Sequence, residues 1–587
     1  MKNFLYSFLG TLAGIWVSVI LGGILLVLTI IAIFVNMNPD VKVDDHSILR
    51  ISLNGVVVDR EEELTLMDMV QGNTEHIISL SQIVKAIEYA KDDKRIDGIY
   101  LECDGASVGL AQAQALIDAI GSFKSSGKWV VAYADNYDQS NYFVATAADK
   151  VILNPIGMVD IHGLSAKTFY LKDLLDKVGL DMQVVKVGTY KSAVEPLLMS
   201  DMSEANREQQ VHFLGNIWKQ YTADVAERRG LHADSIKSWA SSFYFTQKAD
   251  SYMEDGIVDS LMYHRQVDEM MAKMTDEDDP KFVDFADYYS EASHKFSDKY
   301  DDCEYEVAVL YALGDITENE KGGIASQRLV PQILKLADDD NIDGLILRVN
   351  SGGGSAFASE QIWEALEQYK AKTGKPFYVS MGDMAASGGY YISCGADRIY
   401  AEPMTLTGSI GIFGIIPNFQ PLMKDKLGVN VVTVHTNQGG FPDVWEPMTP
   451  EQRAAMQSYI DRGYELFTSR CAAGRGVPVD SIYKVAEGRV WDGISAKRLG
   501  LVDELGGLDD AIAGMADKLS TTRSNIKIVE YPAVANQWWT RLFDMSGEDL
   551  SVMAPDKNVV TDLYKEIYRR VRVMYPVQSR TDMIHIE

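Results

Sequence analysis

Apolar runs and amphipathic stretches alternate along the second half of the chain. The apolar runs have the length of strands, and the amphipathic stretches carry their apolar residues at helical spacing. The predicted strands are Tyr305–Leu310, Gly344–Val349 and Pro376–Met381, and the predicted helices are Val330–Leu336, Ala358–Tyr369 and Ala385–Cys394. This order predicts an α/β fold, in which helices cover a parallel or mixed sheet.

The first half of the chain repeats this pattern. Ile96–Leu101 resembles Ile342–Leu347 at a displacement of 246 residues (342 − 96). Ala148–Ile152 resembles Ala396–Tyr400 at a displacement of 248 residues (396 − 148). Because the matches hold nearly one displacement, we interpret the chain as a tandem repeat of two homologous domains.

The repeat divides the chain into five parts. We expect a cytoplasmic stub and membrane anchor over 1–46, an N-terminal repeat domain over 47–275, a polar connecting segment over 276–302, a C-terminal repeat domain over 303–520 and an extension over 521–587. The extension has no repeat partner. Its apolar cluster predicts a core or subunit contact, with a membrane-interface contact as the alternative; the cluster consists of Trp538, Trp539, Leu542 and Phe543.

The amino-terminal 35 residues form a nearly unbroken apolar run, in which Lys2 is the only charged side chain. Residues 11–35 are enough to cross a bilayer core of about 30 Å at about 1.5 Å per residue. A cleaved signal peptide has a shorter apolar core and a small-residue cleavage site, so we favour an uncleaved transmembrane helix. Lys2 precedes the span and Asp40 follows it, which predicts a body on the periplasmic side of the inner membrane.

Composition excludes several classes of function. The chain has 587 residues and a formal net charge of −29, which argues against nucleic acid as a partner. Its four cysteines include no CxxC pair, and its nine histidines include no HExxH motif. We therefore expect neither a metal site nor a cofactor.

Three loops rich in glycine and serine follow predicted strands of the second half. They are Asn350–Ser355, Gly382–Gly389 and Thr407–Ile410. Active sites of such folds lie beyond the carboxyl ends of the strands, so these loops predict the site. Ser409 stands out because Gly408 and Gly411 allow a tight turn that presents its hydroxyl group. A helix-capping serine is the alternative interpretation.

The two halves differ where the chemistry is expected. At a displacement of 248 residues (409 − 161), Ser409 falls on Ile161 of the first half. The first half instead carries Lys191, whose counterparts in the second half are Gln438, Gly439 or Gly440. One half therefore holds the serine and the other the lysine, which predicts one composite site per chain.

Four motifs resemble those of the signal peptide peptidase A family in its long, tandem form. They are Arg348–Ser355, Met384–Tyr391, Thr407–Gly411 and Tyr190–Pro196. The resemblance implies a Clp-peptidase/crotonase fold, a membrane-attached homotetramer, Ser409 as the nucleophile and Lys191 as the general base. The chain departs from the family at Gly352, where the family usually has a proline that pre-sets the turn.

A lysine base must lose its charge before it can act. An exposed lysine has a pKa of about 10.4 and is protonated at neutral pH, whereas burial disfavours the ammonium form. Lys191 lies in a mostly uncharged stretch, with Glu195 four residues later. Because a carboxylate facing the amine would stabilise the ammonium, we predict that Glu195 points away. Lys186 is the nearest rival base.

The oxyanion of a serine protease requires backbone N–H donors. We predict Gly353 and Gly354 for this role, with an amide near Ser409 as a further candidate. Ser387 is the rival nucleophile, because its Met-Ala-Ala-Ser-Gly setting resembles that of Clp-type peptidases. A serine–histidine mechanism through His435 has weaker support, since this histidine has no clear aspartate partner.

Together these features predict a membrane-anchored serine endopeptidase. Its expected substrates are cleaved signal peptides and other extended hydrophobic peptides, which it cleaves through an acyl-enzyme formed by a Ser/Lys dyad. Two alternatives stay open from the sequence. One is a crotonase-type acyl-CoA enzyme, and the other is a non-catalytic membrane scaffold with a degenerate site.

Overall fold

The computed structural model describes residues 42–60, 77–103, 105–301, 303–319, 322–437, 439–532, 578–580 and 585–586, with isolated positions between 10 and 25. The transmembrane helix expected over 11–35 lies almost wholly outside these residues, and the cluster of Trp538, Trp539, Leu542 and Phe543 lies entirely outside them. Within the described part of the chain, no helix is both long enough and apolar enough to cross a membrane.

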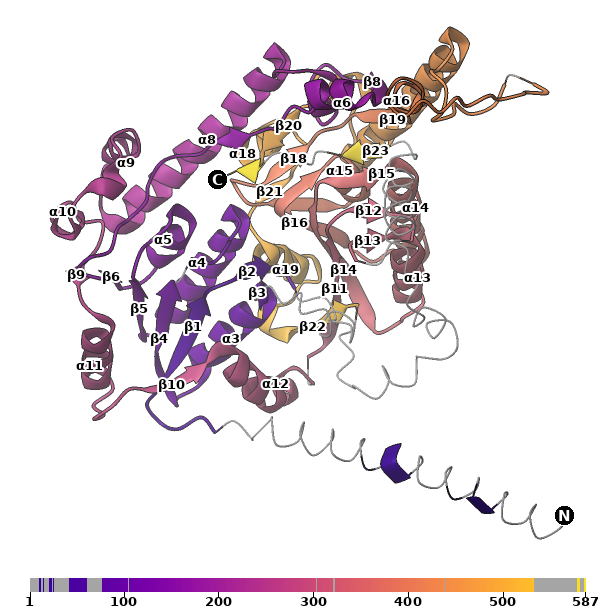
Figure 1. Ribbon diagram of the computed structural model, residues 1–587. Helices are drawn as coiled ribbons and strands as arrows, with labels where there is room; N and C mark the ends of the chain where they lie inside the picture. Colours follow the sequence, from indigo (N-terminus) through magenta and orange to yellow (C-terminus); the bar gives the residue numbers. More distant parts are fainter. Residues whose placement is uncertain are drawn as a thin grey trace.

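The first half is built on a parallel six-stranded sheet (Figure 1). Its strands, in spatial order, are β10 (Lys281–Asp284), β1 (Ser47–Leu53), β4 (Ile96–Cys103), β5 (Trp129–Ala134), β6 (Lys150–Leu153) and β9 (Ser260–Leu261). Successive side chains of β4 face opposite sides. Leu101 packs in the larger core, and Tyr100 packs in a second cluster with Met271. The sheet is therefore covered by helices on both faces.

Helices of the first half complete these layers. On the larger core side they include α3 (Leu80–Asp92), α4 (Leu110–Lys124), α5 (Gln139–Ala145) and α8 (Glu204–Arg229), and on the other side α11 (His264–Met274). This half also contains β2 (Val56–Val58), β3 (Ile77–Ser79), β7 (Ala166–Lys167), α6 (Lys172–Val178), α7 (Glu195–Leu198), α9 (Ala233–Ala240), η1 (Tyr244–Thr246) and α10 (Ala249–Glu254).

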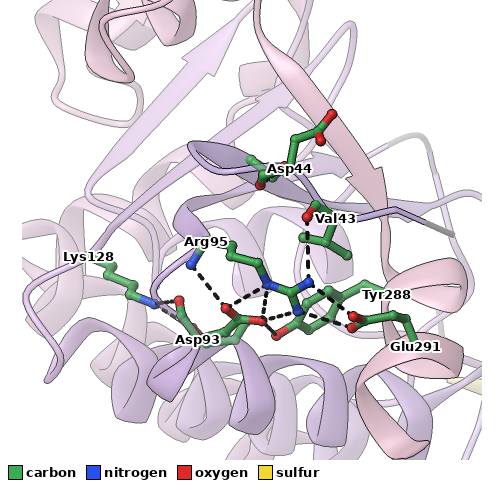
Figure 2. Close-up of polar contacts among 9 residues, drawn as sticks. Val43, Asp44, Asp93, Arg95, Lys128, Tyr288 and Glu291 are labelled. Atoms are coloured by element: carbon green, nitrogen blue, oxygen red, sulfur yellow. Dashed lines mark hydrogen bonds and ion pairs between the residues drawn. The ribbon is translucent and has the colours of Figure 1, made fainter. Parts of the chain in front are cut away.

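The segment that we expected to be a polar connection is ordered structure packed on the first half. Residues 281–284 form β10, which pairs with β1, and residues 285–301 form α12 (Phe285–Asp301), which packs on α3. Figure 2 shows how α12 is held: Arg95 donates to Glu291 at 3.0 Å, and the Tyr288 hydroxyl donates to Asp93 at 3.2 Å. The buried Tyr288 explains why a segment of mostly polar composition docks instead of staying solvated.

The second half repeats the architecture on an eight-stranded sheet. Its main path is β20 (Val490–Asp492), β18 (Leu406–Gly408), β16 (Phe377–Ala386), β14 (Ile342–Ser351), β11 (Tyr305–Leu313) and β22 (Ile526–Tyr531). Off this path, β17 (Arg398–Ala401) pairs with β16, and β21 (Glu504–Leu505) pairs with β17. The helices are α13 (Ser326–Ala337), α14 (Ala356–Thr373), α15 (Gly388–Ser393), α16 (Pro450–Arg475), α17 (Val479–Tyr483), α18 (Gly493–Arg498) and α19 (Leu508–Lys518), with the short turns η2 (Leu422–Lys426) and η3 (Arg523–Asn525).

The strands and helices predicted in the second half are present, with small shifts of their boundaries. The three predicted strands correspond to β11, β14 and β16, although Pro376 precedes β16, and the first two predicted helices lie in α13 and α14. The short helix begins at Gly388 instead of Ala385, because β16 continues to Ala386 and pairs there with Gly408. Residues 526–531 of the extension form β22 and complete the sheet edge next to β11.

A third sheet joins the two halves. Its order is β13 (Ile324–Ala325), β12 (Ile316–Thr317), β15 (Gly353–Ser355), β23 (Gln578–Arg580), β19 (Ile412–Asn418) and β8 (Asp181–Val187). β8 belongs to the first half, yet it runs antiparallel along the whole of β19 in the second half. This crossing carries the residues that follow β8, including Lys191, into the second half. The two-stranded pair of β7 and β24 (His585–Ile586) lies apart from it.

Candidate active site

Lys191 enters the second half through a close contact between two loops. The Tyr190 N–H donates to the Glu487 carbonyl at 2.9 Å, which ties the lysine loop to the residues before β20. Gly488 has a φ of +78°, and a Cβ atom there would lie 2.6 Å from the Cβ of Lys191. Only glycine therefore leaves room for this approach. The Lys191 side chain is 1% exposed.

The amine of Lys191 contacts two serines of the second half. Its Nζ donates to Ser387 Oγ at 2.6 Å, to Ser409 Oγ at 3.1 Å and to the Ser409 carbonyl oxygen at 3.1 Å. It also lies 5.9 Å from the centre of the Phe413 ring. All of these residues are buried. The structure thus brings the predicted Lys191 and Ser409 together, and it adds Ser387 to the same cluster.

Ser387 occupies a strained position between β16 and α15. Its φ of 56° and ψ of −114° lie in a region that residues with a side chain seldom adopt. Its N–H donates to the Gly408 carbonyl at 2.8 Å, and its side chain does not cap the helix. The strained turn directs the Ser387 hydroxyl toward Lys191 and places the Gly388 amide at the first position of α15, where helices leave N–H groups without intrahelical acceptors.

Ser409 lies on the tight turn that its flanking glycines predicted. Gly408 has a φ of +78°, and a Cβ atom at Gly411 would lie 2.9 Å from the Cα of Gly488. The Ser409 N–H donates to the Arg489 carbonyl at 2.7 Å. The amide of Ser409 is thus engaged within the fold, and its hydroxyl and carbonyl oxygens face the lysine.

The glycine loop lies beside Ser387. A Cβ atom at Gly388 would lie 3.2 Å from the Cα of Gly353, and one at Gly354 would lie 2.1 Å from the Ile316 carbonyl oxygen. Gly353 and Gly354 have positive φ angles of 107° and 154°. The Gly353 N–H, which we predicted as an oxyanion donor, donates to Ser351 Oγ at 3.1 Å in this structure.

A slot for one extended strand separates β15 from β19. Residues 578–580 of the same chain fill it as β23, which is antiparallel to β15 with Gly354 opposite Ser579. On its other edge, β23 meets β19 where Gln578 is opposite Phe413. A strand in this slot runs along the glycine loop on one side and along the strand that follows Ser409 on the other.

A cavity of about 1270 Å³ opens next to this slot. The cavity borders both strands that flank the slot. Ile412, the first residue of β19, lines it, and so does Ala356, which directly follows β15. Apolar side chains line much of it: Tyr391, Ile412, Phe441, Met456, Leu466 and Phe467. The cavity suits large apolar side chains of a chain bound in the slot.

The other candidates from the sequence have different partners. Glu195 accepts hydrogen bonds from Asn206 Nδ2 at 3.0 Å and from Ser203, at the start of α8, and this orientation agrees with the prediction that it points away from Lys191. Lys186 Nζ donates to the Lys191 carbonyl at 3.3 Å and so supports the lysine loop. His435 lines the cavity and lies 3.8 Å from Glu446.

A buried polar network that the sequence analysis did not identify supports the glycine loop. Asp59 of the first half accepts from Arg348 Nε at 2.7 Å and from Asn350 Nδ2 at 2.7 Å. Asn350 Oδ1 in turn accepts from the Met384 N–H at 3.1 Å. Burial acts to raise the pKa of Asp59, but Arg348 and the bond from Asn350 outweigh it and hold that pKa below its usual range. In the sequence, the signal for this network was Arg348, a charged residue at the start of the Arg348–Ser355 motif.

The corresponding place in the first half is filled by a glutamine. At a displacement of 248 residues (387 − 139), Ser387 corresponds to Gln139, and Ile161 stands in the place of Ser409. Gln139 Oε1 accepts from the Gly163 N–H at 2.9 Å, and its Nε2 donates to the Gly163 carbonyl at 3.0 Å. The first half therefore carries no serine at either position.

Comparisons with known proteins agree with this architecture. The profile of peptidase family S49 matches residues 122–277 and 369–522, and the Clp protease profile matches residues 315–405. Three relatives are informative. "Protease 4" of Haemophilus influenzae is 35% identical over 541 residues, which cover 89% of this chain and 86% of that protein. "Serine protease SPPA, chloroplastic" of Arabidopsis thaliana is 28% identical over 93% of this chain and 79% of that protein. "Putative signal peptide peptidase SppA" of Enterococcus faecium is 33% identical over 35% of this chain and 59% of that protein.

Proposed function

Because this chain belongs to peptidase family S49 and is a serine protease, we propose that Lys191 and Ser387 are its catalytic pair. One observation carries the proposal: the buried Lys191 Nζ of the first half lies 2.6 Å from Ser387 Oγ of the second half. This is the contact that a base needs to remove a hydroxyl proton. Neither the acyl-CoA enzyme nor the non-catalytic scaffold is favoured by the family match.

Three observations favour Ser387 over Ser409 as the nucleophile. Its hydroxyl is closer to the amine, at 2.6 Å against 3.1 Å. Its strained turn lies directly beside the glycine loop that would bind the oxyanion. The Clp protease profile includes residue 387 and ends at residue 405, before Ser409. In this assignment Ser409 orients the amine through its hydroxyl and carbonyl oxygens, and attack by Ser409 is the competing assignment.

The proposed reaction starts with Lys191 as a neutral amine. Burial removes water from the amine and favours the uncharged form. Lys191 Nζ takes the proton of Ser387 Oγ as that oxygen attacks the peptide carbonyl. The resulting ammonium gives its proton to the leaving amine, which yields an acyl-enzyme and a free amino terminus. Water then hydrolyses the ester, with Lys191 again as the base.

Backbone amides would stabilise the oxyanion of this reaction. The Gly388 N–H is adjacent to the nucleophile, and the Gly353 and Gly354 amides lie across from it in the glycine loop. We propose that the oxyanion takes the Gly353 N–H from Ser351 Oγ, to which it is bonded in the free site. Such an exchange would need only a small change of the loop.

The proposed substrates are extended, apolar peptides. The slot between β15 and β19 offers main-chain pairing on both edges, which is how strand addition binds a peptide without regard to its sequence. The neighbouring apolar cavity would select large hydrophobic side chains. Cleaved signal peptides meet both requirements, and the name of the Enterococcus faecium relative points to the same class.

We also propose a single-pass anchor and a homotetrameric assembly. The anchor rests on the apolar run over 11–35, which would place the catalytic body on the periplasmic side of the inner membrane. The tetramer rests on the resemblance to the family. Protease digestion of intact spheroplasts would test the first proposal, because a body outside the membrane would be digested without lysis.

Covalent labelling would test the catalytic pair. The full chain is treated with a fluorophosphonate, which phosphonylates activated serines, and the modified residue is located by mass spectrometry of peptides. We expect labelling at Ser387 in the wild type and none in Ser387→Ala or Lys191→Ala. Ser140→Ala, at the first-half counterpart of Gly388, serves as a control that should label normally. A label on Ser409, retained in Ser387→Ala, would overturn the assignment.

A further inference from the structure

The two halves of the chain are joined by a strand that one half adds to the other. β8 of the first half pairs with β19 of the second, with Val185 opposite Gly414 and Gln183 opposite Ile416. Met182 of β8 is buried there with Phe413 and Ile415 of β19, and Val194, which precedes α7, packs against them. The helix α16 covers the added strand, because Arg453 donates to the Val184 carbonyl at 3.2 Å and Gln457 to that of Lys186 at 3.3 Å.

The internal repeat supplies a second copy of each partner in this contact. Residues 179–187 resemble residues 428–436 at a displacement of 249 (428 − 179), so 430–436 is the counterpart of β8. Residues 164–170, which follow Gly163, are the counterpart of β19 at a displacement of 248 (412 − 164). The helix α8 is the counterpart of α16 at a displacement of 246 (450 − 204), so Val211 stands in the place of Gln457.

These counterparts do not meet within one chain. Val432 and Val434 are 85% and 91% exposed, and no strand is assigned between 427 and 449 in the part of the chain that the structure describes. On the other side, Phe169 is 73% exposed and Val211 is 68% exposed. Figure 1 shows the orange segment before α16 projecting from the body. Val432, Val434 and Phe169 are thus exposed, whereas their repeat counterparts Gln183, Val185 and Pro417 are buried.

We propose that residues 430–436 of one copy of this chain add as an antiparallel strand to residues 164–170 of a second copy. The register of β8 on β19 within one chain gives the expected register between the two copies. Ile416 opposite Gln183 becomes Thr168 opposite Val432, and Gly414 opposite Val185 becomes Ala166 opposite Val434. The proposed contact between two copies therefore repeats the contact that joins the two halves within one chain.

The amino-acid sequence of residues 430–436 suits an added strand. Its sequence Asn-Val-Val-Thr-Val-His-Thr is rich in β-branched residues, which favour strands, and an exposed run of valines is costly in water. Arg207 is the counterpart of Arg453 and would bind the carbonyl of the added strand in the same way. Residues 585–586 pair antiparallel with Lys167 and Ala166.

The geometry also determines the type of assembly. Each copy carries one strand to give and one edge to receive, so the contact is heterologous and not self-complementary. Repetition of a heterologous contact leads to a closed ring or to an open filament, and a closed ring leaves no edge unpaired. The proposal does not depend on which serine attacks, since neither strand contains a proposed catalytic residue.

Cysteine cross-linking would test the register. In a Cys303→Ser background, full chains carrying Thr168→Cys and Val432→Cys are purified separately in mild detergent, mixed and oxidised. Opposed residues of antiparallel strands are close enough for a disulfide. We expect a cross-linked dimer from this mixture and at least about tenfold less from Thr168→Cys with Val431→Cys, because a shift by one residue turns the side chain to the other face. Equal yields from both mixtures would overturn the proposal.

Disruption of the strand would test its role in assembly. We expect Val432→Asp combined with Val434→Asp to convert the assembled wild type to single chains in light scattering. Phe243→Asp combined with Phe245→Asp, which places the same two charges at another exposed apolar site, should leave the mass unchanged. An assembly that keeps its mass in the double variant, or a wild type that is a single chain, would contradict the inference. Neither readout depends on activity, so failure of the proposed catalytic pair would be seen separately.

Discussion

Lys191 Nζ and Ser387 Oγ lie 2.6 Å apart, although the two residues are separated by 196 positions and come from different halves of a duplicated chain. The first half has a glutamine, Gln139, where the second has Ser387, and the second half has no lysine at the counterpart of Lys191. Each half has thus kept one member of the pair. The duplication explains why a site for one peptide needs both halves and the strand β8 that joins them.

Replacement of the lysine distinguishes a base from a mere positive charge. We expect Lys191→Ala to lower kcat/KM on a hydrophobic reporter peptide at least about 10³-fold. Lys191→Arg should be equally inactive, because a guanidinium stays protonated and cannot accept the serine proton. Lys177→Ala, at an exposed lysine of α6, is the matched control and should retain most activity. Substantial activity of Lys191→Arg would contradict a base at this position.

Loss of the Ser409 hydroxyl should have an intermediate effect. Ser409 Oγ and the Ser409 carbonyl both contact the amine, and the substitution removes only the first. A hydrogen bond to a group that becomes charged contributes about 1.5–3 kcal/mol, so we expect Ser409→Ala to lower kcat about 10- to 150-fold. Ser387→Ala should be far more damaging. The reverse order, measured on the same peptide, would identify Ser409 as the nucleophile.

Gly488 should be essential for a steric reason. A Cβ atom there would lie 2.6 Å from Lys191 Cβ, on a backbone with a φ of +78°. We expect Gly488→Ala to displace the lysine loop and to lower activity about 100-fold or more, by misplacing the base by about 1 Å. Gly476→Ala is the control, because Gly476 has a φ of +62° with nothing within 4 Å. It should cost about 1 kcal/mol of stability and leave kcat nearly unchanged.

Glu402 should make the stability of the second half depend on pH. Burial raises the pKa of Glu402 to about 8, and the charge of Asp118 on the first half adds to the shift. The unfolded chain loses this proton near its ordinary pKa of 4.5, so between these pH values the folded state holds more protons. The free energy of unfolding therefore falls as the pH rises through this window, by on the order of a few kcal/mol.

Urea unfolding at pH 5 and pH 8 would measure this effect. We expect Glu402→Gln to lose most of the difference in midpoint between the two pH values, because the amide does not ionise. Glu465→Gln, on the exposed face of α16, should keep the difference. An unchanged difference in Glu402→Gln would show that other groups cause the pH dependence.

Removal of the carboxyl end should speed peptide cleavage. Residues 578–580 occupy the slot between β15 and β19 that we assign to substrate. We expect a chain that ends at residue 577 to have a severalfold lower KM, and a peptide of residues 576–582 to inhibit it competitively. A chain that ends at residue 583 keeps these three residues and should behave like the full chain. An unchanged KM in the shorter chain would show that the tail does not compete with substrate.

The alternation of strands and helices was predictable because it depends on local side-chain periodicity. Runs such as Gly344–Val349 are buried on both faces, and Ala358–Tyr369 carries its apolar residues at helical spacing, so each pattern indicates its element without knowledge of the fold. The segment 281–301 was not predictable in this way. It docks through Tyr288 and Glu291, whose partners Asp93 and Arg95 lie almost two hundred residues earlier in the chain.

The sequence by itself also predicted a composite site of Lys191 and Ser409, with Ser387 as the rival nucleophile, because those residue types follow from chemistry and from the difference between the halves. Only the tertiary structure decided how they are arranged. The strand β8 crosses to β19, Gly488 leaves room for the lysine, and the strained turn at Ser387 brings a second hydroxyl to the amine. These relationships depend on distances between residues far apart in the chain, which no local pattern of side chains contains.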